Sequence, residues 1–146
     1  MNMICTFFGH RDASDTIRPL LRETLTGLIE RQDVRHFYVG NQGNFDAMAR
    51  SVLAELQTTY EIRYEVVLAY MPQKTDPIFK NIPTVLPEGI EAVPRRFAID
   101  RRNRWMIEHS DIVVAYVTRS FGGAAKFRDI ARKQKKTIIE IETHIK

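Results

Sequence analysis

The chain has 146 residues, of which 44% are hydrophobic, and this fits one domain with one sizeable core. The formal net charge of +4 is a mild excess that indicates a solvated surface rather than a nucleic-acid patch, because many basic residues stand beside acids. No signal-peptide pattern is present, and no apolar run approaches the roughly 18 residues that span a bilayer, so no membrane partner is expected. The single cysteine, Cys5, fits a reducing cytoplasm.

Short apolar runs alternate with helical periodicities along the chain. Apolar, β-prone runs predict five strands, at residues 3–8, 36–39, 62–70, 112–117 and 137–141. Apolar spacings of three and four predict helices that begin near residues 16–18 and after Asn44 as N-cap, and that span 97–109 and 123–135. This order predicts a single α/β domain over residues 1–146. The fold is Rossmann-like and doubly wound, with a mostly parallel five-stranded sheet and helices on both faces.

The periodic pattern breaks between residues 71 and 95. This stretch contains Pro72, Pro77, Pro83, Pro87 and Pro94. A loop of this length in a compact domain is usually functional or carries short elements of its own. The sequence therefore predicts a proline-rich lid or flap beside a binding site.

Three glycine turns fall at the carboxyl ends of predicted strands. They are Gly9-His10-Arg11, Gly40-Asn41-Gln42-Gly43 and Gly122-Gly123. Ligands of doubly wound folds bind at the carboxyl ends of strands, where helix N-termini present unpaired N–H groups and partial positive charge. The three turns together predict a site for a phosphorylated, nucleotide-like ligand, with Arg11 as a phosphate-binding side chain.

Several of these residues also have purely structural interpretations. Asp46 follows the second turn, where it either caps the helix dipole or binds a ribose hydroxyl. The pair His10 and Arg11 fits a surface loop as well as a site. Only one or two residues of the run 101–104 can face the site from one helix.

No spacing of His and Cys residues fits a metal, so neither a metal nor a cofactor is expected. The catalytic residues stay unassigned, since no carboxylate pair is fixed by the sequence. The candidate acids are Asp46, Glu88, Glu91, Asp100 and Asp111.

Taken in order, the motifs resemble the SLOG superfamily, a Rossmann-like group that unites DNA-processing protein A with LOG-type phosphoribohydrolases. The chain looks most like the small stand-alone bacterial YpsA-type branch. The residues that carry the resemblance are Thr6-Phe7-Phe8-Gly9-His10-Arg11, Val39-Gly40-Asn41-Gln42-Gly43-Asn44-Phe45-Asp46, Arg101-Arg102-Asn103-Arg104-Trp105-Met106-Ile107, Ser110-Asp111 and Gly122-Gly123-Ala124-Ala125.

The resemblance implies a nucleotide or nucleotide-derived ligand above the sheet. LOG enzymes place an Arg four residues before a Met that precedes Ser-Asp, and Arg102, Met106 and Ser110-Asp111 keep that spacing. Those enzymes then carry P-G-G-x-G-T-x-x-E with a catalytic Glu. This chain has no Pro and no Glu there, and Lys126 and Phe127 stand instead. The departure favours binding over phosphoribohydrolase chemistry.

The first hypothesis is therefore a nucleotide-binding sensor or regulatory module. Its expected ligand is a nucleotide or an ADP-ribose-like molecule, and its expected site consists of Gly9, His10, Arg11, Gly40, Asn41, Gly43, Asp46, Arg102, Asn103, Gly122 and Gly123. The alternative is an enzyme that cleaves the N-glycosidic bond of nucleotides, like a phosphoribohydrolase or a deoxyribosyltransferase. The modest charge and the lack of a basic-aromatic stripe argue against single-stranded DNA as a partner. A homo-oligomer is compatible with the sequence.

Overall fold

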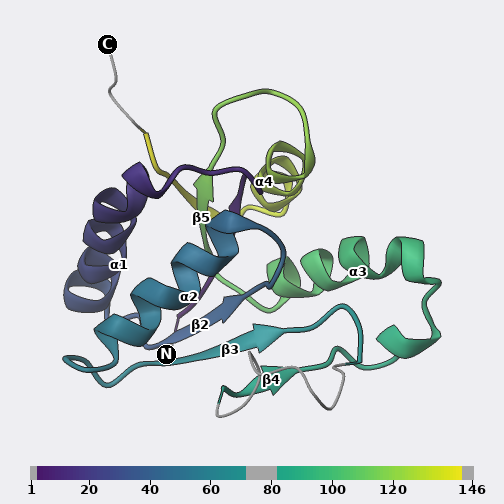
Figure 1. Cartoon of the computed structure of the whole chain (residues 1–146), viewed down its shortest axis with the longest axis horizontal. Coiled ribbons are helices and arrows are strands. Elements are labelled where there is room, and N and C mark those ends of the chain that lie inside the picture. Colours follow the sequence, from purple (N-terminus) through teal and green to yellow (C-terminus); the bar gives the residue numbers. More distant parts are fainter. Residues whose placement is uncertain (1–2, 72–81, 143–146) are drawn as a thin grey trace.

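A computed structural model describes residues 3–71 and 82–142 as an α/β fold around a six-stranded, all-parallel sheet (Figure 1). The strands lie in the order β4-β3-β2-β1-β5-β6. Their bounds are β1 (Ile4–Gly9), β2 (His36–Val39), β3 (Arg63–Val67), β4 (Thr84–Val85), β5 (Ile112–Tyr116) and β6 (Thr137–Glu140). The helices are α1 (Arg18–Gln32), α2 (Asn44–Leu56), α3 (Arg95–Glu108) and α4 (Gly123–Lys133), with the 3-10 turns η1 (Asp15–Ile17) and η3 (Ile90–Ala92).

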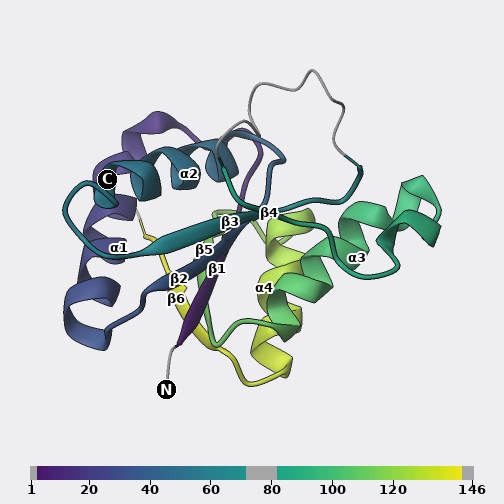
Figure 2. The same ribbon diagram turned by 90° about the horizontal axis from the view of Figure 1, so that it is seen from below.

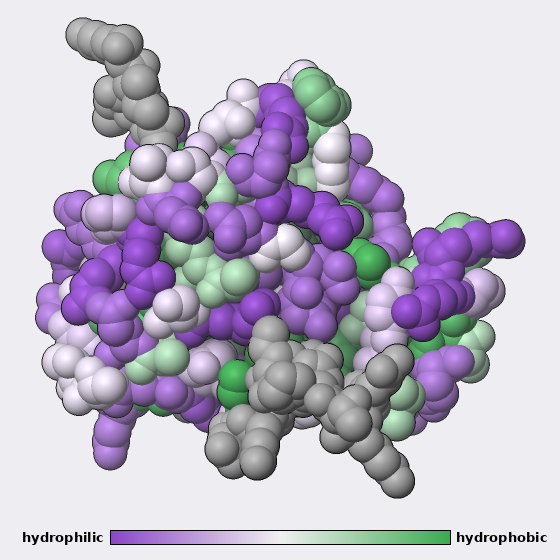
Figure 3. Space-filling view, in the orientation of Figure 1, coloured by the Kyte–Doolittle hydropathy of each residue, from purple (hydrophilic) through white to green (hydrophobic). Residues whose placement is uncertain are grey.

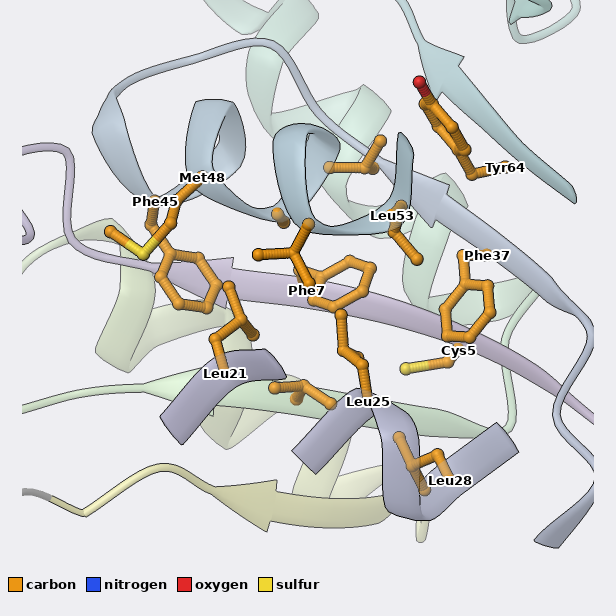
Figure 4. Close-up of a cluster of buried hydrophobic side chains, with 14 of the residues drawn as sticks. Cys5, Phe7, Leu21, Leu25, Leu28, Phe37, Phe45, Met48, Leu53 and Tyr64 are labelled. Atoms are coloured by element: carbon orange, nitrogen blue, oxygen red, sulfur yellow. The ribbon is translucent and has the colours of Figure 1, made fainter. Parts of the chain in front are cut away.

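The sheet is doubly wound, as predicted, because its helices cover both faces. Helices α1 and α2 lie on one side of the sheet and α3 and α4 on the other (Figure 2). Successive side chains of a strand point to opposite faces. Phe7 accordingly packs with Leu21 and Leu25 of α1 in the larger core (Figure 4), whereas Phe8 packs with Phe127 on the opposite side. Each such side chain contributes about 1.5–3 kcal/mol by leaving water.

The prediction of five strands was wrong by one, because β4 lies within the proline-rich stretch. This strand has only two residues and pairs with β3 in parallel, Val66 opposite Thr84. A two-residue strand directly after Pro83 shows no alternation that the sequence could reveal. Part of the predicted lid, residues 72–81, lies outside the described residues. From residue 82 onward, the stretch forms the sheet edge and η3.

The starts of α1 and α2 show how the loops are fixed. Helix α1 begins at Arg18 with Pro19 in its first turn, as predicted. The expectation that Asn44 caps α2 was wrong, because the N-cap is Gly43 and Asn44 is the first helical residue. The Asn44 amide instead donates to the Ala13 carbonyl and, over 3.1 Å, to the Asp15 carboxylate.

The order of the strands places a switch point between β1 and β5. The chain moves outward from β1 to β4, then returns to the other side of β1 for β5 and β6. The carboxyl ends of β1 and β5 are neighbours there, since Gly9 pairs with Tyr116. In doubly wound folds this edge is where ligands bind.

The visible surface carries no extended apolar area. Hydrophilic residues dominate the face in Figure 3, and the apolar ones form small separate groups. Within residues 3–71 and 82–142, none of the helices is both long and apolar enough to cross a membrane.

Candidate functional site at the switch point

A cavity of about 290 Å³ lies at the switch point between β1 and β5. Its lining comes from the end of β1, the start of α2, the middle of α3 and the start of α4. The residues that the sequence predicted and that line it are Gly9, Arg11, Asp46, Arg102, Asn103 and Gly123. Segments from opposite ends of the chain thus converge at the predicted edge of the sheet.

Arg102 is the most deeply buried charged group of this site. The residue is only 1% exposed. Its Nη1 donates to Asn41 Oδ1 and to the Val67 carbonyl, each over 3.1 Å. Its Nε donates to Asn103 Oδ1 over 2.8 Å. Burial lowers the pKa of Arg102 and the Asp46 carboxylate opposes that shift, so the guanidinium stays charged. Arg102 therefore ties α3 to the ends of β2 and β3.

Asp46 is the matching buried carboxylate on α2. Its Oδ2 accepts the N–H of Gln42, the residue before the N-cap Gly43, over 3.0 Å, so Asp46 fixes the turn that leads into α2. Burial raises the pKa of Asp46, and the charge of Arg102 is the largest opposing influence. Its second oxygen, Oδ1, accepts no hydrogen bond from the described residues.

Gly40 makes room for this pair of charges. A Cβ atom at Gly40 would lie 2.6 Å from Asp46 Oδ2 and 3.3 Å from the Arg102 guanidinium carbon. The Gly40 carbonyl also accepts a 3.0 Å hydrogen bond from Arg50. Gly40 and Asn41 do not line the cavity; Gly40 leaves space for the two charged groups that do, and Asn41 accepts a hydrogen bond from one of them, Arg102.

Two further glycines join the loops that frame the cavity. A Cβ atom at Gly9 would fall within the ring of Phe45, the second residue of α2. Gly43 has φ +90°, and a Cβ atom there would lie 2.6 Å from Arg11 Cα. The Asn44 N–H also donates to the Arg11 carbonyl over 2.8 Å. The space beside Gly43 thus belongs to the Arg11 backbone, and Gly43 does not line the cavity.

His10 joins the loop after β1 to the loop after β5. The residue is 5% exposed, and its Nε2 accepts the Thr118 N–H over 2.8 Å. Because Nε2 accepts a backbone N–H, the ring is neutral with its proton on Nδ1. Burial lowers the pKa of His10, and the charge of Arg119 adds to the shift. His10 positions the loops and does not line the cavity.

The N-terminus of α4 is the open helix end of the site. The N–H groups of Gly123, Ala124 and Ala125 belong to the first helical turn and have no hydrogen-bond partner among the described residues. A Cβ atom at Gly122, which is the N-cap, or at Gly123 would meet no atom within 4 Å. At α2, by contrast, the first N–H is already bound to Arg11.

Arg11 adds a free positive charge to the same cavity. The residue is exposed, lines the cavity, and forms no ion pair with any described residue. A guanidinium beside uncapped helix N–H groups is the arrangement that binds phosphate. The lining also has an apolar part, to which Phe8, Met106 and Phe127 contribute.

Most candidate acids lie outside the cavity. Asp100 is bound by Arg104 over 2.7 Å and by Lys126 over 2.6 Å, which links α3 to α4. Asp111 precedes β5, at the opposite end of the sheet, and its Oδ2 accepts the Ile4 N–H over 2.9 Å. Glu88 and Glu91 are exposed on the connection before α3. Asp46 is the candidate that lines the cavity. No group of three metal-ligating side chains occurs in the described ranges.

The lining also includes residues that sequence reasoning did not assign to the site. These are Phe7, Phe8, Gln42, Ile99, Met106, Ala124 and Phe127. Met106 is 1% exposed and lines the cavity, so it is both a core residue and part of the cavity wall. Its position one turn after Arg102 on α3 is a helical spacing that could have indicated a shared face.

No protein-family model matches the chain, and no curated protein matches it as a relative. The function is therefore inferred from the site itself.

Proposed function

We propose that the chain binds a nucleotide or nucleotide derivative in the cavity at the switch point and acts as a sensor or regulatory module. The observation that carries this proposal is the uncapped N-terminus of α4 beside the unpaired Arg11, both on one cavity. The hydrogen-bond donors in this part of the site have no partner among the described residues. We include in the proposal the resemblance to the SLOG superfamily, whose motifs supply these residues.

The other walls suit the remaining parts of a nucleotide. Asp46 Oδ1 is the acceptor for a ribose hydroxyl, and the apolar wall of Phe8, Met106 and Phe127 takes a planar base. A volume of about 290 Å³ is at the lower end of small-molecule pockets, which favours a mononucleotide inside it. A longer ligand such as ADP-ribose would extend past the rim.

A thermal-unfolding screen tests this proposal. We expect a nucleoside monophosphate at one hundred times its Kd to stabilise the protein by about 2.7 kcal/mol. Arg11→Ala should weaken the monophosphate roughly 10- to 100-fold and leave the matching nucleoside unaffected, because a charge-assisted contact to phosphate is lost. Titration calorimetry of both ligands measures the difference.

Arg101→Ala is the matched control, since Arg101 is exposed on α3 and outside the cavity lining. It should bind both ligands as the parent does. Equal weakening of monophosphate and nucleoside by Arg11→Ala would show that Arg11 does not contact phosphate. The absence of any shift with nucleotides, NAD or ADP-ribose would refute the proposed function.

A second candidate is cleavage of the N-glycosidic bond, favoured by one observation. Asp46 lines the cavity with a pKa raised by burial, which suits a general acid for a departing base. Its Oδ2 is already committed to Gln42, and Lys126 and Phe127 of α4 stand where the LOG pattern brings its catalytic Glu.

We therefore expect purified protein to release no free base from nucleoside monophosphates beyond trace levels. Acid assistance commonly contributes about 10²- to 10⁴-fold to rate, so a working acid would be obvious by chromatography. Robust turnover that disappears in Asp46→Asn would replace the sensor with the enzyme. The control is the Asp111→Asn variant, whose carboxylate lies at the other end of β5.

A further inference from the structure

Phe121 has the most exposed large apolar side chain in residues 3–71 and 82–142. The residue is 70% exposed and stands in the loop 117–122, between β5 and α4. In Figure 1 this loop arches away from the sheet before it enters α4. Singly exposed apolar residues are common, so the exposure alone assigns no role to Phe121. A role for Phe121 is inferred from the residues around it.

Two contacts place this loop near the cavity. Gly123 and Ala124, which closely follow Phe121, line the cavity. Within the loop, Arg119 pairs over 3.2 Å with Asp12, the residue after the cavity-lining Arg11. Phe121 is not itself part of the lining, but it stands two residues before the cavity-lining Gly123, next to the open N-terminus of α4.

The part of the loop around Phe121 is held only by weak, exposed contacts, since the Arg119 guanidinium lies over the Phe121 ring at 5.6 Å from its centroid. Arg119, Ser120 and Phe121 take part in no backbone–backbone hydrogen bond with the described residues. The exposed ion pair Arg119–Asp12 contributes little, as such pairs generally do. Gly122 has φ +96° with nothing within 4 Å of its Cβ position, so neither side chain nor neighbour restricts the turn there.

We propose that Phe121 stacks on the base of a nucleoside monophosphate bound in the switch-point cavity, after the loop pivots at Gly122. This inference rests on the proposed function. With the phosphate on Arg11 and the start of α4, the base lies between the apolar wall of Phe8, Met106 and Phe127 and the ring of Phe121. The ligand class is then a nucleotide with a heteroaromatic base rather than a plain sugar phosphate, and aromatic stacking accepts any of the bases.

Titrations of AMP, GMP, CMP, UMP and ribose 5-phosphate test the stacking role. Loss of base stacking should make Phe121→Ala bind the best monophosphate roughly 5- to 150-fold more weakly, with ribose 5-phosphate unchanged. Phe97→Ala is the matched control, because Phe97 is also exposed, at 51%, but stands on α3 outside the cavity lining. Since the chain has one tryptophan, Phe121→Trp in a Trp105→Phe background gives a single reporter, and AMP should quench its fluorescence.

The outcomes separate the two proposals. If the parent binds a monophosphate and Phe121→Ala binds it equally well, the stacking role is refuted while the proposed function stands. If Phe121→Ala weakens the nucleotide and ribose 5-phosphate alike, the loop supports the phosphate rather than the base, and the stacking role is again refuted. If the parent binds none of the monophosphates at millimolar concentration, the stacking role is refuted, and the proposed function fails as well if NAD and ADP-ribose also do not bind.

Discussion

Replacing Gly43 with alanine should lower the free energy of unfolding by about 3 to 5 kcal/mol, measured by urea denaturation. Two costs add at this position. Gly43 has φ +90° and ψ −178°, a region that is essentially restricted to glycine. The new Cβ atom would also lie 2.6 Å from Arg11 Cα, a backbone atom that moves only if the loop after β1 moves.

Gly122 provides a matched control within the same chain. It is also an N-cap, with φ +96° and ψ 175°, but a Cβ atom there meets nothing within 4 Å. Gly122→Ala should therefore show the backbone cost alone, about 1 to 3 kcal/mol. If both substitutions destabilise the protein equally, the contact between Gly43 and Arg11 is not rigid, and the loops that frame the cavity are looser than the structure indicates.

The fold was largely predictable from the sequence because its signals are local. The apolar runs at residues 3–8 and 112–117 correspond to the buried central strands β1 and β5, and the spacing after residue 44 matches α2. Strand β4 was not predicted, because two residues after a proline show no hydrophobic periodicity. The alternation of strands and helices then required parallel pairing and helices on both faces.

The site was predictable as a place but not as a set of contacts. Glycine turns after strands must meet at the carboxyl edge, and Asp46 and Arg102 do line one cavity there. Which groups a turn contacts depends on distant segments. The His10 ring binds the Thr118 N–H, 108 residues away in sequence, and the space at Gly43 is taken by Arg11. No local pattern encodes such pairings.

The predicted site residues fall into two groups, those whose polar atoms are hydrogen-bonded within the protein and those whose polar atoms are not. Asn41 accepts from Arg102, and His10 accepts from Thr118, so each is committed within the protein. Arg11 and the first N–H groups of α4 are not committed to any described residue. The hydrogen-bonded residues form the frame of the site, and the donors without a partner among the described residues are the basis of the nucleotide proposal.

Replacing Arg102 with alanine is the second large expected effect, a loss of about 3 to 5 kcal/mol at neutral pH. The substitution removes the positive charge that most strongly stabilises the buried Asp46 carboxylate. It also removes the donor to Asn41 and to the Val67 carbonyl. Arg104→Ala is the control on the same helix, since Arg104 makes an exposed pair with Asp100 and should change stability by only about 0–1 kcal/mol.

The pH dependence separates the two contributions to this loss. Burial raises the pKa of Asp46 in the folded state, so its effect on stability is favourable at low pH and is lost as pH rises through the folded-state pKa. Removing Arg102 raises that pKa further, and the deficit of Arg102→Ala relative to the parent should therefore grow from about pH 4 toward neutrality. The part that comes from lost hydrogen bonds does not change with pH.

Adding Asp46→Asn to Arg102→Ala keeps an acceptor for the Gln42 N–H, and should remove the pH-dependent part of the loss and recover stability at neutral pH. A double variant as unstable at neutral pH as Arg102→Ala alone would show that Arg102 acts through its hydrogen bonds and not by compensating the charge of Asp46.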